Sequence, residues 1–354
     1  MKSHINNSMT GIRLLLIGLF SVLLSACPTK QVDNSPVSHF RRVPHKNLQI
    51  SNRIDLESLD TYRPFSIKKD SHRYFVFDYA RSNIFKIIDR STLQVRQGVN
   101  YGNGPGELIY PTSFIKEKTG MTVYEINTMK RYLIMEDSDS ALYIIDFQDI
   151  GVEAVSLPDF HGSYMAAKSW KGDSWIKYYK DGIEIDSYGF PDFPETRDME
   201  TSVLVDAYKS GQHRFKPDGT RLAVVIDNGC ALAIYDCDEK GINERILLNY
   251  FPPIFVRTKS DYSPTAVSMK CRTGFVGLEC TDSFVYTLYA GKIVGDDVNK
   301  AWHGSHVFVY DWDGNPVAHY ELEKELFAFG VDEKEGLLYG IGYDPEGCIL
   351  EYKF

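Results

Sequence analysis

Three short segments of the sequence carry residue types that could bind a ligand or a metal ion. The closely spaced glycines of Gly102–Gly106 would let backbone N–H groups approach an anion. Residues 311–315 begin like a calcium loop. His303 and His306 lie beside Trp302 at a spacing that one metal ion could bridge. The first segment suggests phosphate binding and the other two suggest metal binding.

None of the three segments completes a known motif. The glycine spacing is neither a dinucleotide fingerprint nor a P-loop, and Pro105 removes one N–H group. Residues 311–315 lack the distal bidentate glutamate of a calcium loop, and the two histidines have no third ligand nearby. We therefore interpret the first segment as a connection between structural repeats and the second as a hairpin turn. We expect no metal and no cofactor, with a two-histidine site as the alternative.

The sequence contains no local catalytic signature. Neither a Gly-x-Ser-x-Gly elbow nor a His-Glu-x-x-His helix is present. An enzyme whose site is assembled from distant repeats stays open as an alternative, because one sequence does not reveal such a site.

The first residues are typical of an exported lipoprotein. Lys2 and Arg13 precede an uninterrupted apolar run over residues 14–24, which is shorter than the roughly 20 residues needed to span a bilayer. Leu24-Ser25-Ala26-Cys27 is similar to a bacterial lipobox, in which cleavage precedes the cysteine and lipid is attached to it. We predict a signal peptide over residues 1–26, lipid on Cys27 and a flexible polar tether up to residue 45. The absence of an acidic cluster after Cys27 favours the periplasm over the cell surface.

Charge and cysteine content narrow the possible partners. The chain has 39 basic and 48 acidic residues, a net charge of −9, which disfavours nucleic acid as a partner. Five further cysteines, an odd number, leave at least one thiol unpaired unless chains are cross-linked. Cys230 and Cys237 are expected at opposite ends of one strand, too far apart to bridge each other. All five are Cys230, Cys237, Cys271, Cys280 and Cys348.

A strand-like apolar motif recurs six times at intervals of roughly 50 residues, a period near that of propeller blades. Each copy follows a tight-turn signal and precedes one or two further strands, which predicts four antiparallel strands per repeat. The motif occupies residues 74–78, 121–125, 175–179, 222–226, 284–288 and 337–341.

The two ends of the chain predict ring closure. The last repeat, from residue 326 to 354, has three strands, whereas residues 48–55 form an isolated strand ahead of the first repeat. An N-terminal strand that completes the last blade would leave no open sheet edge. We predict an all-β fold, a six-bladed propeller of four-stranded blades over residues 46–354.

Two motifs resemble those of a known family. Residues 102–107 with Pro111, and residues 307–316, resemble TolB-like six-bladed propeller lipoproteins of Gram-negative bacteria. The first motif is also similar to the blade junction of NHL-repeat propellers. The resemblance implies a propeller from about residue 48 onward. It implies no catalytic residue.

Long loops predict a binding face. In a four-stranded blade, the junctions between blades and the loops between second and third strands emerge on the same face, and residues 99–111, 251–265 and 291–305 are such loops. Aromatic and charged side chains together favour a binding surface, although solvated loops are the alternative. We predict a non-catalytic module for a protein, peptide or glycan, with a propeller-type lyase or hydrolase, or a structural subunit, as alternatives. The candidate residues are Asn103, Glu107, Tyr110, Arg257, Tyr262, Trp302 and His303.

Overall fold

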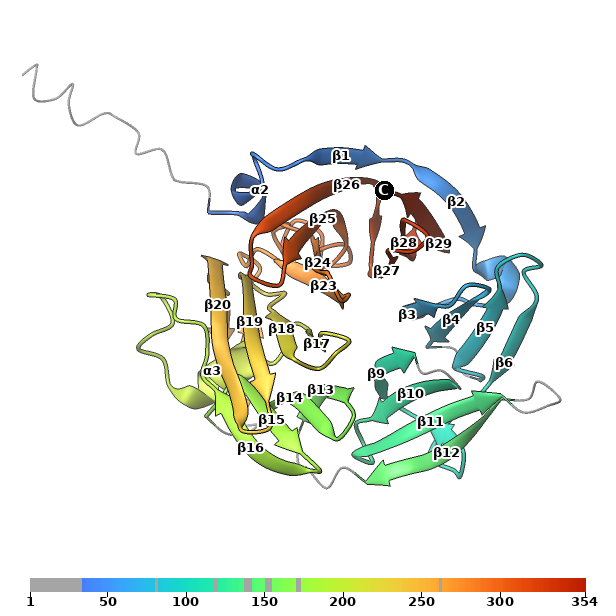
Figure 1. Cartoon of the computed structure of the whole chain (residues 1–354), viewed down its shortest axis with the longest axis horizontal. Coiled ribbons are helices and arrows are strands. Elements are labelled where there is room, and N and C mark those ends of the chain that lie inside the picture. The colour runs from blue at the N-terminus through green and yellow to red at the C-terminus, as the bar shows by residue number, and fades with distance from the viewer. Residues whose placement is uncertain are drawn as a thin grey trace, which may run out of the picture. The chain divides into compact units, whose positions relative to one another are not determined.

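The repeats fold as antiparallel sheets arranged in a ring (Figure 1). This computed structural model describes residues 34–79, 82–116, 120–136, 142–149, 155–169, 173–260 and 263–354. The ring lies within one unit, Ser35–Phe354. Six blades confirm the predicted all-β six-bladed propeller.

The first three blades are four-stranded. Blade 1 comprises β3 (Pro64–Lys69), β4 (Arg73–Asp78), β5 (Phe85–Asp89) and β6 (Val95–Gly98). Blade 2 comprises β9 (Pro111–Lys116), β10 (Gly120–Glu125), β11 (Lys130–Glu136) and β12 (Leu142–Asp149). Blade 3 comprises β13 (Val155–His161), β14 (Tyr164–Ser169), β15 (Ile176–Lys180) and β16 (Ile183–Tyr188).

The other three blades include both strands from the N-terminal segment. Blade 4 comprises β17 (His213–Phe215), β18 (Arg221–Val225), β19 (Cys230–Asp238) and β20 (Gly241–Phe251). Blade 5 comprises β23 (Phe275–Cys280), β24 (Phe284–Tyr289), β25 (Gly304–Asp311), β26 (Pro316–Leu326) and β1 (His45–Leu48). Blade 6 comprises β27 (Ala328–Asp332), β28 (Leu337–Tyr343), β29 (Gly347–Lys353) and β2 (Ile50–Asp55).

Short elements occupy the connections. Two of them are the parallel pair β7 (Asn100–Tyr101) and β8 (Glu107–Leu108), and the hairpin of β21 (Phe255–Arg257) and β22 (Thr265–Val267). The helical elements are α2 (Pro36–His39), η1 (Glu57–Leu59) and α3 (Thr201–Ala207). No helix in the described part of the chain is both long and apolar enough to cross a membrane.

Ring closure follows the predicted route and adds a strand that the sequence did not indicate. β2 pairs antiparallel with β29 and completes blade 6, as predicted. The preceding strand, β1, pairs parallel with β26 and makes blade 5 five-stranded. A continuous N-terminal segment therefore connects two neighbouring blades along their outer edges (Figure 1).

In five blades the recurring motif lies on the second strand. Both faces of a blade pack against the neighbouring blades, so this strand is buried on both sides and its residues are mostly apolar. Residues 74–78 of β4 are all buried, without the alternation of a strand that has one solvated face. In blade 3 the motif falls instead on β15, the third strand. The second strand, β14, carries small alanines and Lys168, which weaken its apolar signal.

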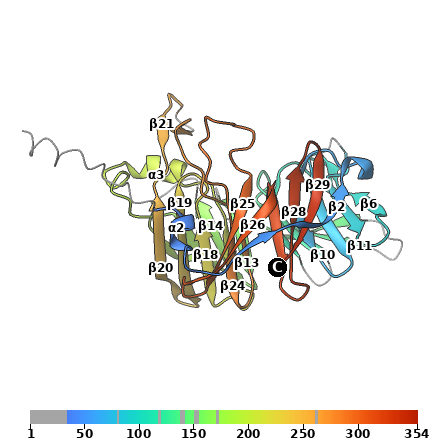
Figure 2. The ribbon, with the colours of Figure 1, turned by 90° about the horizontal axis from the view of Figure 1, so that it is seen from above.

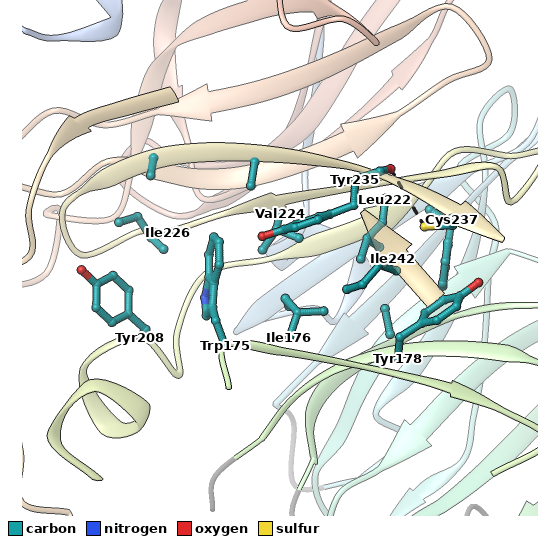
Figure 3. Packing of buried hydrophobic residues seen from close by; sticks show 14 of the residues in the cluster. Trp175, Ile176, Tyr178, Tyr208, Leu222, Val224, Ile226, Tyr235, Cys237 and Ile242 are labelled. Carbon is teal, nitrogen blue, oxygen red and sulfur yellow. Dashed lines mark hydrogen bonds between the residues drawn. The ribbon is translucent and has the colours of Figure 1, made fainter. Parts of the chain in front are cut away.

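Large side chains fill the spaces between blades. Figure 3 shows one interface, where Trp175 beside β15 lies against Val224 and Tyr235 of blade 4. Tyr208, next to α3, extends this cluster. Cys230 and Cys237 lie at opposite ends of β19, as predicted. Close packing of this kind fixes the blades relative to one another, so that residues from distant repeats can form one site.

Candidate functional site

A cavity of about 360 Å³ lies where the first strands of five blades converge. Its walls come from β3, β9, β17, β23 and β27, which are the innermost strands of their blades (Figure 1). The cavity is therefore assembled from repeats that are far apart in the sequence. Its lining includes Phe65, Lys68, Tyr79, Ser113, Phe114, Gln212, Arg214, Asp227, Glu279, Trp302, Phe327 and Phe329.

Loops on one face of the ring surround the mouth of this cavity. Tyr79, Asp227 and Trp302 all belong to loops between second and third strands, and Phe327 lies at the junction of blades 5 and 6. Helix α3 and strand β21, which belong to blade junctions, lie at the same face, the upper side of Figure 2. The mouth therefore opens at the face that carries these long loops.

Aromatic rings form the wall at blades 1 and 2. Phe65 and Tyr79 stack with ring centroids 4.0 Å apart at an interplanar angle of 18°. The ring centroid of Phe114 lies 5.6 Å from that of Phe65, and the ring centroid of Tyr110 lies 6.4 Å from that of Tyr79. Tyr79 and Tyr110 remain exposed, by 40% and 53%. Burial of part of its ring raises the pKa of Tyr79, so the phenol stays protonated at neutral pH.

Trp302 and Phe327 form a second wall of the cavity. Trp302 packs against the buried cluster of Cys271, Val294 and Ala301. His303 lies 5.5 Å from Phe327 and 5.8 Å from Tyr343, ring to ring. Burial lowers the pKa of His303, so the imidazole is neutral at pH 7. His303 therefore supports this wall by ring packing.

Ion pairs neutralise most of the charge in the cavity. Lys68 of blade 1 reaches Glu279 of blade 5 with 2.5 Å between Nζ and Oε1, although these blades are not neighbours in the ring. Arg214 lies 3.9 Å from Asp159. Asp159 also accepts a hydrogen bond from the backbone N–H of Phe215 at 2.7 Å. Burial raises the pKa of the Asp159 carboxyl.

Two polar side chains of the lining have fewer hydrogen bonds than they can form. Ser113 is buried, and its hydroxyl has no hydrogen-bond partner in the described structure. Its φ of 53° places it in the left-handed region, where β9 departs from regular pairing with β10. Asp227 accepts a hydrogen bond from Ser210 through Oδ1 at 2.5 Å. Bulges and strained residues of this kind cluster near functional sites.

The predicted glycine-rich segment is a blade junction. It connects blades 1 and 2, and β7 pairs with β8 across it. The Glu107 carboxylate accepts the backbone N–H of Gly104 at 2.8 Å. Glu107 thus occupies the side of the loop that a phosphate would need, and Asn103 is exposed beside it.

The second predicted segment is a hairpin turn between β25 and β26. Asp311 accepts the backbone N–H groups of Asp313 and Asn315 at 2.9 and 2.8 Å. The two histidines of the third segment separate: His303 packs against Phe327, whereas His306 forms a 3.0 Å hydrogen bond with His319. No group of three or more potential His, Cys, Asp or Glu metal ligands occurs among the described residues.

The structure brings together some of the predicted binding residues. Trp302 lines the cavity, while Tyr110 and His303 contact aromatic residues of its walls. Arg257 lies on the β21 hairpin, exposed, and is 3.7 Å from Glu200. It does not line the cavity. Tyr262 and Cys27 lie outside the described residues.

The cavity residues of the innermost strands were not predicted from the sequence. Phe65, Phe114, Lys68 and Glu279 sit on first strands, whose apolar pattern is weaker than that of second strands. Tyr79 follows the first copy of the motif directly. A search at the end of each motif copy would have found it.

Several solved structures are similar to this chain at low sequence identity. A putative exported protein of Bacteroides fragilis has 14% identity and a TM-score of 0.49, with coverage of 87% of this chain and 98% of that one. A DUF4221 family member from Bacteroides vulgatus has 12% identity and a TM-score of 0.49, with coverage of 87% and 98%. The β-propeller domain of Myceliophteria thermophila Cps50 (Swd1) has 13% identity and a TM-score of 0.44, with coverage of 86% and 100%. Likenesses at these values carry no information on function.

A comparison with curated proteins finds no match. The sequence pattern of one family, described as TolB-like 6-blade propeller-like, matches residues 46–334. This match spans most of the chain and covers the ring of blades up to the turn before β28, and the family is the one that the two sequence motifs predicted. The chain therefore belongs to the TolB-like six-bladed propeller family.

Proposed function

We propose that this chain is a lipid-anchored propeller of the cell envelope, facing the periplasm, that binds a protein, peptide or glycan without transforming it. The observation that carries the proposal is the cavity mouth, where aromatic rings from distant repeats lie around one opening. Exposed aromatic side chains on rigid supports contribute far more to affinity than to stability. Tyr79 and Tyr110 are exposed in this way, and the half-buried Trp302 presents part of its ring to the cavity.

The cavity chemistry favours binding over acid–base catalysis. Among the described residues that line it, none is histidine or cysteine. The Glu279 carboxylate is paired with Lys68. It is therefore not free to accept a proton from a ligand. An enzyme needs a positioned proton donor or acceptor within hydrogen-bond reach of the reacting group. The alternative, a lyase or hydrolase, would have to use Asp227.

Capture from solubilised envelopes tests the binding role. We expect the full chain, immobilised in detergent, to retain an envelope component, and Tyr110→Ala with Trp302→Ala to weaken retention at least tenfold. Tyr143→Ala is the matched control, because Tyr143 is an exposed tyrosine on β12 of blade 2, outside the cavity. Equal retention by a folded double variant would contradict the proposal. Recovery of the retained material in chemically altered form, prevented by Asp227→Asn, would favour the enzyme.

The anchor is tested separately. If Cys27 carries lipid, Cys27→Ser should release the chain from the membrane fraction or leave its signal uncleaved, because the lipid is the main membrane attachment in this proposal. Lipid labelling measures this directly. Unchanged labelling of the variant would contradict the anchor without affecting the binding role.

A further inference from the structure

The size of the cavity limits what it can hold. Ligand pockets of proteins usually measure about 300 to 1,000 Å³, and this cavity lies near the lower end at about 360 Å³. There is room for a ligand of roughly one or two six-membered rings. The stacked pair Phe65 and Tyr79 on one wall, and Trp302 with Phe327 on the other, offer flat apolar surfaces to such rings. The ligand must therefore have an apolar face.

The charges of the lining argue against an ionic ligand. Lys68 is held by Glu279 at 2.5 Å, and Arg214 lies 3.9 Å from Asp159. An anion that recruited Lys68 or Arg214 would leave a partly buried carboxylate without its partner, and a cation drawn to Glu279 would do the same to Lys68. Breaking a buried ion pair in this way is costly. A ligand without net charge avoids this cost, and the buried Lys168, whose ammonium interacts with the Asp227 carboxylate, offsets the attraction of Asp227 for a cation.

The remaining polar groups call for hydroxyl partners. Asp227 has one hydrogen bond from Ser210, on Oδ1, and its carboxylate accepts further donors. Ser113 belongs to the same lining, and its hydroxyl has no partner and is shielded from solvent, so a ligand reaches it only after a turn of the side chain. A buried hydroxyl without a partner loses free energy, which a ligand group able to donate and accept recovers. Hydroxyl groups donate to Asp227 and both donate to and accept from Ser113.

We infer that the cavity binds a neutral sugar ring, with its apolar C–H face on the aromatic walls and its hydroxyl groups hydrogen-bonded to Asp227 and Ser113. This inference rests on the proposed binding function and names the ligand class of the same site. A sugar ring combines one apolar face with a hydroxyl-bearing edge, which matches aromatic walls that flank isolated polar groups. The aromatic rings provide dispersion contacts, and the two polar groups fix the orientation of the ring.

Direct binding to defined sugars tests the inference. The probes are glucose, galactose, mannose and N-acetylglucosamine, with glucuronic acid and glucosamine as charged relatives. Saturation-transfer NMR and calorimetry on the full chain in detergent measure the affinities. We expect at least one neutral sugar to bind, with its charged relative at least tenfold weaker. Asp227→Asn and Ser113→Ala should each weaken binding about tenfold. Asp282→Asn is the matched control, because Asp282 is exposed in the β23–β24 turn, at the opposite end of the blade.

Two results would overturn the sugar assignment. One is that no neutral sugar binds to the folded chain, and the other is that Asp227→Asn binds the sugar as well as the parent does. If capture from envelopes still depends on Tyr110 and Trp302 in that case, the binding role stands and only the ligand class is wrong. If capture is also unaffected by that double variant, both proposals fall.

Discussion

The closing seam and the cavity mouth are built in opposite ways. At the seam, formed by β1 and β2 against blades 5 and 6, apolar side chains such as Leu48 and Ile54 are buried, and the backbone of β2 pairs along β29. At the mouth, Tyr79 is 40% exposed, and in the cavity behind it the Ser113 hydroxyl has no partner. The groups of the seam are buried or hydrogen-bonded within the chain, whereas the mouth and cavity have exposed aromatic surface and polar groups that can accept further hydrogen bonds. Substitutions at the seam should therefore affect stability, and substitutions at the mouth should affect binding.

Two acids show the same contrast within the repeat. Asp78 and Asp227 both lie at or just after the end of a second strand. Asp78 is fully buried, pairs with Lys86 at 3.1 Å and accepts the backbone N–H groups of Tyr62 and Arg63 at 3.2 and 2.7 Å. Asp227 lies in the cavity lining with its hydrogen bond from Ser210. One acid holds a blade junction together, and the other is available to a ligand.

Removal of the seam should have the largest effect. Deleting residues 45–55 takes away β1 and β2, exposes the outer edge of β29 and leaves blade 6 with three strands. We expect a strongly lowered Tm and aggregation, measured by thermal denaturation and light scattering. The milder Ile54→Ala should cost about 2 to 5 kcal/mol of unfolding free energy, with Lys46→Ala on the exposed side of β1 as control. Melting of the deletion variant at the parent temperature would show that the seam does not close the ring.

Substitution of the two acids should lower the unfolding free energy by different amounts. Asp78→Ala leaves Lys86 buried without its counter-charge and should cost about 3 to 5 kcal/mol. Asp227→Ala loses the hydrogen bond from Ser210 and the attraction to Lys168, which forms no direct ion pair with it, and should cost about 1 to 2 kcal/mol. Chemical denaturation of both variants gives the difference. Equal costs would contradict the division between structural and ligand-facing acids.

Acidification should weaken the seam. His319 stacks on His45 of β1 and hydrogen-bonds His306, and burial lowers its pKa to about 4. The folded state therefore binds fewer protons than the unfolded state, whose histidines titrate near 6.5. This contribution is fully present above pH 6.5 and is lost as the pH falls to about 4, by at most about 3 kcal/mol.

Denaturation at several pH values measures this effect. His319→Phe keeps the ring packing against Phe40 and Phe308 but removes the titrating group, so its unfolding free energy should fall less steeply between pH 6.5 and 4. The same slope in parent and variant would assign the pH dependence to other groups.

The smallest stability effects should occur at the mouth. Tyr79→Ala removes a ring that is 40% exposed and should change the unfolding free energy by about 1 kcal/mol or less. Its effect on ligand retention should exceed tenfold. Comparison of Tm and retention for the same preparation separates the two effects, and a large loss of stability would place Tyr79 in the structural framework.

The sequence predicted the ring better than the site, for a physical reason. Second strands such as β4 are buried on both faces, and their continuous apolar residues stand out from the rest of the chain. First strands line the cavity and therefore mix polar and apolar residues, as in Lys68 and Ile67 of β3. β1 was missed because three of its four residues are exposed. The contact of Lys68 with Glu279 joins positions 211 residues apart, which no local pattern reveals.

The Trp302 side chain offers the most direct test of binding at the mouth. In a chain labelled with 5-fluorotryptophan, the Trp302→Phe variant assigns the ¹⁹F resonance of Trp302. This resonance should shift when the neutral sugar is added. The resonances of Trp175 and Trp312, which are buried outside the cavity, should stay in place. Binding that leaves the Trp302 resonance unchanged, or that shifts only Trp175 or Trp312, would contradict the assignment of the cavity as the binding site.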